Sequence, residues 1–304
     1  MHITRSVDID APAEKILPAI NDFNHWDKWS PWLIMEPEAT VEVADDAKSY
    51  SWTGKRVGEG KMAITNENGQ KSIDYDLTFL KPWKSEAKVR FELEEKGDST
   101  KVTWFMDSSL PFFLFWMKKM TEAFVGMDYE RGLNMLKDYV ETGDVPTELD
   151  FKGRDSYRGC QYVGVKSECS MKNVGPSMEK DFEKLHSWVK DNSDNVADKP
   201  FSIYHKWDMV KDKVVYTSGI PVKNLPDNVP PGMVKGSIPS TSVYTIGHKG
   251  PYRHLGNAWT TGYNMKQNKV FKMNNKVDTF ETYVSDPSEV SENELITEVH
   301  FPVK

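Results

Sequence analysis

The residues best suited to chemistry lie in the last strand-like segment of the chain, LITEVHFPV at residues 295–303. Period-two alternation puts Glu298 and His300 on one face of such a strand. A carboxylate among Leu, Ile, Val and Phe has to be paired or desolvated, because an isolated buried charge is very costly, and desolvation raises its pKa. Two interpretations of Glu298 therefore stay open: a carboxylate in a binding pocket, or an exposed or structurally paired carboxylate with a lysine or arginine partner.

Four aromatic residues are candidates for the wall of the same pocket: Tyr204, Tyr252, Trp259 and Tyr283. Aromatic faces bind flat or cationic molecules through stacking and cation–π contacts, which contribute about 0.5–2 kcal/mol each. Tyr252 follows a Gly-Pro pair at a predicted helix start and Tyr283 lies beside the closing strand, which favours these two. For Trp259 and Tyr204, packing in the core explains the residue type equally well.

The elements that must position these residues occur twice in the second half of the chain. Each copy predicts a strand, a helix that begins after Gly-Pro, a strand, and a closing strand that ends in Pro-Val. The first copy comprises CQYVGVKSE and residues 175–189, 201–204 and 214–222; the second comprises STSVYTIGH and residues 250–263, 280–283 and 295–303. Two such units related by a pseudo-two-fold axis predict two sheets side by side, with helices on one face and a groove on the other.

The two copies differ in charge where their closing strands are aligned. Glu298 in the second copy stands where the first copy has Thr217, and His300 stands where it has Gly219. A carboxylate that appears in only one copy of a shared framework indicates a function confined to that copy. This difference singles out Glu298, and both interpretations of its carboxylate stay open on the residues alone.

The second half also resembles a known family. GHKGPYRHLGNAW, ETYVSDP and ELITEVHFPVK are similar to the GyrI-like effector-binding domain over about residues 158–304. The resemblance implies two βαββ repeats that bind small, often aromatic or cationic, molecules in a central groove, and it places the pocket carboxylate in TEVHFPV, at Glu298. It also implies that some members hydrolyse strained cyclopropane rings. Regulators of this type carry a helix-turn-helix domain, which we do not find ahead of this segment, so direct transcriptional control is not favoured.

The first half has a different composition and pattern. Seven of the ten tryptophans lie in the first 120 residues. Residues 2–10 predict a strand, and residues 118–141 predict a long amphipathic helix. Residues 39–110 predict a series of alternating strands divided by Gly, Asp, Asn and Lys turns, one of them YSWTGKRV at residues 50–57. This order of elements predicts an α+β domain in which an antiparallel sheet grips one C-terminal helix.

Three segments of the first half resemble the START-like helix-grip superfamily, in its polyketide cyclase/dehydrase branch. They are IDAPAEKI near the start, FNHWDKWSPW after the first helix, and VGMDYERGLNMLKDYVE on the last helix, and the similarity covers about residues 1–143. The resemblance implies an apolar ligand cavity. It implies no particular activity, because functions in the superfamily range from lipid carriage to cyclisation.

Between the two halves, residues 144–157 are polar, contain Pro146 and Gly153, and show no periodicity, which predicts a linker. The domains are therefore expected at residues 1–143 and 158–304. The apolar run LPFFLFWM at residues 110–117 is too short to span a membrane and predicts a lid over the cavity, a domain interface or part of the core.

Composition narrows the functional classes. The net charge of −7 argues against a surface for nucleic acid, and the two cysteines, Cys160 and Cys169, lack the spacing of a zinc site or of a disulfide scaffold. No secretion signal is found at the N-terminus, so a cytoplasmic location is expected. Phosphate loops and dinucleotide fingerprints are absent, so we expect no cofactor and no metal. No particular oligomeric state is indicated.

These observations favour a small-molecule binding protein, acting as a sensor, a carrier or a sequestering protein for a hydrophobic, aromatic or cationic ligand. The alternative is a hydrolase of reactive, cyclopropane-type molecules. In it, Glu298 acts as general acid or base with the hydroxyl of Tyr283 or Tyr252 as proton donor. A third hypothesis is that the protein acts only through interaction, with residues 110–117 as a docking surface.

Overall fold

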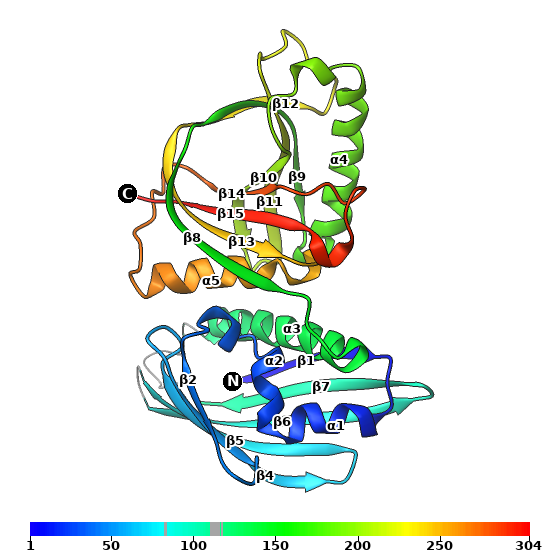
Figure 1. Ribbon diagram of the computed structural model, residues 1–304, viewed down its shortest axis with the longest axis vertical. Coiled ribbons are helices and arrows are strands. Elements are labelled where there is room, and N and C mark those ends of the chain that lie inside the picture. The colour runs from blue at the N-terminus through cyan, green and yellow to red at the C-terminus, as the bar shows by residue number, and fades with distance from the viewer. Residues whose placement is uncertain (82–83, 110–115, 117) are drawn as a thin grey trace. The chain divides into compact units, whose positions relative to one another are not determined.

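The computed structural model describes residues 1–81, 84–109, 116 and 118–304, and its contacts divide the chain into two compact units, Met1–Pro146 and Thr147–Lys304 (Figure 1). Each unit combines an antiparallel sheet with a few helices, so the predicted α+β class is confirmed. Most of the run at residues 110–117 lies outside the described residues. Only Trp116 of that run is described, and its side chain is exposed.

In the first unit the described residues form one seven-stranded sheet in the order β1-β7-β6-β5-β4-β3-β2. Apolar residues alternate with polar ones along the long strands, so that one face of the sheet is buried. The strands are β1 His2–Ile9, β2 Thr40–Val43, β3 Ser49–Thr53, β4 Glu59–Asn68, β5 Ser72–Lys81, β6 Ser85–Lys96 and β7 Ser99–Ser108.

The buried face of this sheet packs against helices α1 Ala13–Asn21, α2 Trp26–Trp29 and α3 Lys118–Thr142 (Figure 1). The long helix predicted at residues 118–141 is therefore confirmed. Trp104 of β7 stacks on Tyr129 of α3 with their ring centres 3.9 Å apart, and Trp104 also stacks on Phe91 of β6 at 4.8 Å. An aromatic core thus joins the sheet to α3.

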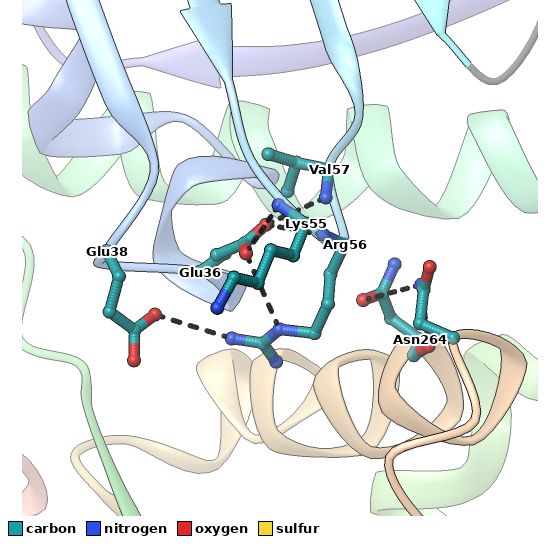
Figure 2. Close-up of polar contacts among 7 residues, drawn as sticks. Glu36, Glu38, Lys55, Arg56, Val57 and Asn264 are labelled. Atoms are coloured by element: carbon teal, nitrogen blue, oxygen red, sulfur yellow. Dashed lines mark hydrogen bonds and ion pairs between the residues drawn. The ribbon is translucent and has the colours of Figure 1, made fainter.

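The strand predicted at residues 50–57 ends early, at Thr53. The backbone N–H groups that follow form hydrogen bonds with the buried carboxylate of Glu36. Glu36 accepts hydrogen bonds from the backbone N–H groups of Lys55, Arg56 and Val57 at 2.9, 2.8 and 2.8 Å, as Figure 2 shows. These three residues form the tip of the β3–β4 hairpin, which Gly54 closes by donating its backbone N–H to the carbonyl oxygen of Gly58 at 2.8 Å. The segment forms a loop because its N–H groups bond a side chain instead of a neighbouring strand.

In the second unit the described residues form one continuous eight-stranded sheet in the order β12-β9-β11-β10-β14-β15-β13-β8. The two predicted repeats are present as β9 Cys160–Cys169, α4 Val174–Lys190, β10 Phe201–Asp208 and β11 Lys213–Val222, and as β13 Thr241–Lys249, α5 Gly256–Gln267, β14 Thr279–Tyr283 and β15 Ile296–Pro302. The repeats share one sheet, rather than two separate ones, because β10 and β14 pair with each other.

Two further strands extend the repeats. Strand β12, Val234–Ile238, pairs with β9 at one end of the sheet, and strand β8, Glu148–Tyr157, pairs with β13 at the other. Most of the stretch expected to be an irregular linker, residues 144–157, is therefore a strand. Its polar composition is explained by its position at a sheet edge, where Leu149 and Phe151 pack towards the core while the alternating residues Glu148, Asp150 and Lys152 are exposed.

The short connection that remains between α3 and β8, residues 143–147, is expected to be the main site of limited proteolysis. Each unit has its own hydrophobic core, so cleavage there should release two folded pieces. Limited proteolysis followed by size-exclusion chromatography and melting of each fragment tests this expectation. A single cooperative melt of the intact chain, together with insoluble fragments, would contradict it.

Candidate functional site

The centre of the second unit's sheet brings equivalent positions of the two repeats face to face. Phe201-Ser202-Ile203-Tyr204 of β10 is equivalent to Phe280-Glu281-Thr282-Tyr283 of β14, and Ser202 pairs directly with Glu281 across the two strands. The pseudo-two-fold axis therefore passes between Ser202 and Glu281. A single carboxylate stands at the point where the two repeats meet.

Glu281 is buried, with 1% of its surface exposed, and three neutral donors surround its carboxylate. Its Oε1 accepts hydrogen bonds from the hydroxyls of Tyr283 at 2.6 Å and Tyr204 at 2.9 Å. Its Oε2 accepts a hydrogen bond from the indole Nε1 of Trp259 at 2.7 Å. Both oxygens are thus held in a fixed orientation by aromatic side chains.

The donors come from elements that the repeat places around β14. Tyr204 is the counterpart of Tyr283 in the first repeat, and the two tyrosines reach the carboxylate from neighbouring strands. Trp259 comes from α5, which approaches the sheet closely because Gly262 leaves no side chain against the ring of Phe301. The rings of Tyr204 and Trp259 meet edge to face at 4.9 Å.

A second, more exposed aromatic side chain packs against each of the three donors. Tyr252 lies 5.7 Å from Tyr283, Tyr263 lies 6.3 Å from Trp259, and Trp207 lies 5.6 Å from Tyr204, measured between ring centres. These outer rings are about two-fifths exposed. The carboxylate is therefore surrounded by an inner layer of aromatic donors and an outer layer of partly exposed aromatic rings.

The electrostatics of this group are unusual for a carboxylate. Burial raises the pKa of Glu281, and the three hydrogen bonds from Tyr283, Trp259 and Tyr204 only partly offset that rise. Within the described parts of the chain, no lysine, arginine or histidine forms an ion pair with Glu281. Burial and the nearby carboxylate also raise the pKa of both tyrosines well above 10, which keeps them protonated as donors.

Four of the residues proposed from the sequence, Tyr204, Tyr252, Trp259 and Tyr283, are thus brought together around Glu281. They lie on the face of the sheet that the helices cover, because Trp259 comes from α5 and Met178 of α4 lies 3.7 Å from the Tyr283 hydroxyl. This differs from the expectation of a groove on the face opposite the helices.

Glu298 and His300 lie on the other face. Glu298 pairs across the sheet with Thr282, the residue after Glu281, so its side chain points away from the aromatic cluster. Its carboxylate forms an ion pair with Lys152 of β8, and His300 is 3.8 Å away. His300 hydrogen-bonds the hydroxyls of Thr245 and Thr282, at 3.0 and 3.2 Å. Glu298 thus matches the alternative of a structurally paired carboxylate, with a lysine as its partner.

Glu281 was not among the residues proposed from the sequence, although the two repeats carry a signal for it. The comparison that singled out Glu298 asks where one repeat has a carboxylate and the other does not. Applied to residues 201–204 and 280–283, the same comparison finds Glu281 opposite Ser202. Its two aromatic neighbours, Phe280 and Tyr283, give the segment the same apolar character as the closing strand.

In the first unit, the side chains between the sheet and α3 form a packed aromatic core. Five of its large side chains, Trp29, Tyr75, Phe91, Trp104 and Tyr129, are less than 2% exposed. Two open hollows lie over the first unit. Asp76 and Thr78 of the sheet's solvent face line both of them, and Lys88 lines one. The apolar cavity that the START-like resemblance implies is not outlined by these side chains.

Two family models match the chain, one for each unit. Residues 1–141 match the family described as polyketide cyclase / dehydrase and lipid transport, and residues 160–304 match the family described as GyrI-like small molecule binding domain. None of the curated proteins is significantly similar in sequence to this chain. No helix in the described part of the chain combines the length and apolar character needed to cross a bilayer.

Solved structures resemble the units at low sequence identity. The EcmrR C-terminal domain is 17% identical, with 52% of this chain and 98% of that chain covered and a TM-score of 0.40. The EcmrR–DNA complex gives 17% identity, coverages of 62% and 69%, and a TM-score of 0.44. The Aha1 dimer from Colwellia psychrerythraea gives 19% identity, coverages of 47% and 98%, and a TM-score of 0.36. By the two family matches, the chain joins a domain of the polyketide cyclase / dehydrase family at residues 1–141 to a domain of the GyrI-like small molecule binding family at residues 160–304.

Proposed function

We propose that the chain is a small-molecule binding protein whose second unit binds a hydrophobic, aromatic cation at Glu281. The observation that carries this proposal is a buried carboxylate held by three neutral donors, with no cation beside it among the described residues. A buried carboxylate is costly unless a positive charge neutralises it. A cationic ligand supplies that charge.

The aromatic rings around Glu281 suit the same ligand. Tyr204, Trp259 and Tyr283 line the carboxylate, and Tyr252 lies over Tyr283 at the surface. Each ring that faces a cation contributes about 0.5–2 kcal/mol, most where water is excluded. Membership of the GyrI-like small-molecule binding family supports this function, and the role we propose is that of a sensor, a carrier or a sequestering protein.

A hydrolase is the second candidate, and it now centres on Glu281 instead of Glu298. The Tyr283 hydroxyl lies 2.6 Å from Glu281, and the pKa of that carboxyl is raised by burial, which suits an acid–base pair. A reactive electrophile bound over this pair would meet both a proton donor and a base. Product formation from a strained cyclic substrate, lost in the Glu281→Gln variant, separates this candidate from simple binding.

The pH dependence of binding tests the proposed charge recognition. Because the pKa of Glu281 is raised in the free protein, a cation must displace its proton at acidic pH. Affinity for a hydrophobic cation is therefore expected to fall as the pH is lowered through the raised pKa of Glu281, with net proton release on binding. An uncharged analogue of the same shape should bind weakly at every pH. Calorimetric titrations in buffers of different ionisation enthalpy measure both quantities. Equal affinity for the cation and its uncharged analogue would contradict the proposal.

A further inference from the structure

Two buried polar atoms on the Glu281 face of the sheet have no hydrogen-bond partner among the described residues. They are Oγ1 of Thr297 and Nδ1 of His248. Both residues are 1% exposed. Buried polar atoms in folded proteins are nearly always hydrogen-bonded. Two neighbouring buried atoms without a hydrogen-bond partner therefore indicate that a ligand group binds beside them.

The two residues continue the row of side chains that begins at the candidate site. Thr297 of β15 pairs on one side with Tyr283 of β14 and on the other with His248 of β13. All three share the face of Glu281, because Tyr283 is two residues from Glu281 along β14 and donates to it. Thr297 and Glu281 are diagonal neighbours on adjacent strands, which places their backbones about 7–8 Å apart.

The Thr297 hydroxyl and the His248 imidazole are polar but uncharged groups. Nε2 of His248 lies 3.0 Å from the Thr147 hydroxyl, which also accepts a hydrogen bond from Nδ2 of Asn257 at 3.3 Å. Burial, together with the neighbouring His254, lowers the pKa of His248 to about 4, so the imidazole is neutral at neutral pH. A neutral imidazole and a hydroxyl match a group that both donates and accepts, such as a hydroxyl or a carboxamide, better than a second charge.

A partly exposed aromatic side chain, Tyr252, packs against Tyr283 at one end of this row. Its ring meets the Tyr283 ring edge-on at 5.7 Å, and its side chain is 40% exposed. Exposed side chains change rotamer within nanoseconds. Movement of Tyr252 is therefore the simplest way to admit a ligand along Tyr283 towards Thr297.

We propose that Thr297 and His248 form a neutral polar subsite of the Glu281 site, which binds a hydroxyl or carboxamide of the same ligand. This inference rests on the proposed function and narrows the ligand class. The ligand is an aromatic cation that carries an uncharged hydrogen-bonding group within about 7–10 Å of its positive charge.

The test compares two probes on the full chain by calorimetry. One is a benzylammonium ion whose alkyl chain ends in a hydroxyl, and the other is the same ion with a methyl end. The wild type is expected to prefer the hydroxyl-ended ion by about three- to tenfold, the size of one added hydrogen bond. Thr297→Val keeps the side-chain shape and removes the hydroxyl, so it should abolish this preference and leave the affinity for the methyl-ended ion unchanged.

The matched control is Thr282→Val, on the opposite face of the neighbouring strand, which should keep the preference. Thr297→Val should melt at the same temperature as the wild type or higher, because it removes a buried polar group that has no hydrogen-bond partner.

Equal binding of the two ions, with both weakened in Glu281→Gln, would overturn this subsite alone. If neither ion binds the wild type, the proposed function fails and the subsite fails with it. A lower melting temperature of Thr297→Val with an unchanged preference would assign the hydroxyl to a permanently bound water and overturn the subsite.

Discussion

Replacing Glu281 with glutamine is expected to weaken the binding of a hydrophobic cation by about ten- to more than a hundredfold. Glutamine keeps the shape of the side chain and removes its charge, so the ligand loses an interaction worth roughly 1.5–3 kcal/mol. Titration of the wild type and the variant against a panel of aromatic cations measures the loss. An uncharged analogue of the same ligands should show little difference between the two proteins.

The stability of the Glu281→Gln variant is expected to change little, because two effects oppose each other. Neutralising the buried group removes a cost, since a carboxyl whose pKa is higher in the folded state than in the unfolded state destabilises the protein at pH values above both. Against this, the glutamine amide cannot accept hydrogen bonds on both sides, which leaves a donor such as the Trp259 indole unmet. A large drop in melting temperature with unchanged cation affinity would show that Glu281 is only structural.

Glu298 provides the matched control, because it is a second glutamate one strand away on the opposite face. It pairs with Lys152, and both side chains are partly exposed. Ion pairs of this kind contribute about 1 kcal/mol or less to stability. Glu298→Gln should therefore leave cation affinity unchanged. A loss of affinity in this variant, with none in Glu281→Gln, would restore Glu298 as the pocket carboxylate.

The Trp104→Ala substitution is expected to destabilise the first unit by about 3–5 kcal/mol, the usual cost of deleting a large aromatic side chain from a packed core. Trp104 is 1% exposed and stacks on both Tyr129 and Phe91, so its removal leaves a cavity between the sheet and α3. Chemical denaturation followed by tryptophan fluorescence and circular dichroism should show one transition moved to lower denaturant, with ligand binding by the second unit retained.

Trp104→Phe is the control for this substitution. The indole N–H of Trp104 has no hydrogen-bond partner among the described residues, so phenylalanine gives up no hydrogen bond and keeps one aromatic ring in the stack. The variant should lose much less stability than Trp104→Ala. If both variants unfold alike, the aromatic stack does not stabilise the first unit. If Trp104→Ala abolishes binding at Glu281, the two units do not fold and act independently.

Local patterns in the sequence determined which segments form strands and helices. Alternation of apolar and polar residues identified the long strands of both units, and helical spacing identified residues 118–141, because one buried face imposes a period on each element. The repeat in residues 158–304 likewise identified both copies of the strand–helix–strand–strand unit. Segments 160–168 and 240–248 fall within the strands β9 and β13 or one residue outside them.

Other features depended on partners far away in the chain. Residues 148–157 form a strand because they pair with β13, almost a hundred residues later, and their own composition resembles a loop. The strand predicted at residues 50–57 ends at Thr53 because Glu36 bonds the next backbone N–H groups. In both cases the hydrogen-bond partner decided the conformation.

Which of the two glutamates is buried among aromatic donors also depends on the tertiary structure. Alternation places Glu281 and Tyr283 on one face of β14, and Glu298 and His300 on one face of β15, but it does not relate the two strands. The register, in which Thr282 pairs with Glu298, puts the two glutamates on opposite faces. The helices then cover only the Glu281 face, so Glu281 is buried among aromatic donors while Glu298 reaches Lys152 near the solvent. Register and helix packing are set by contacts between distant segments, and a sequence pattern confined to one strand does not contain them.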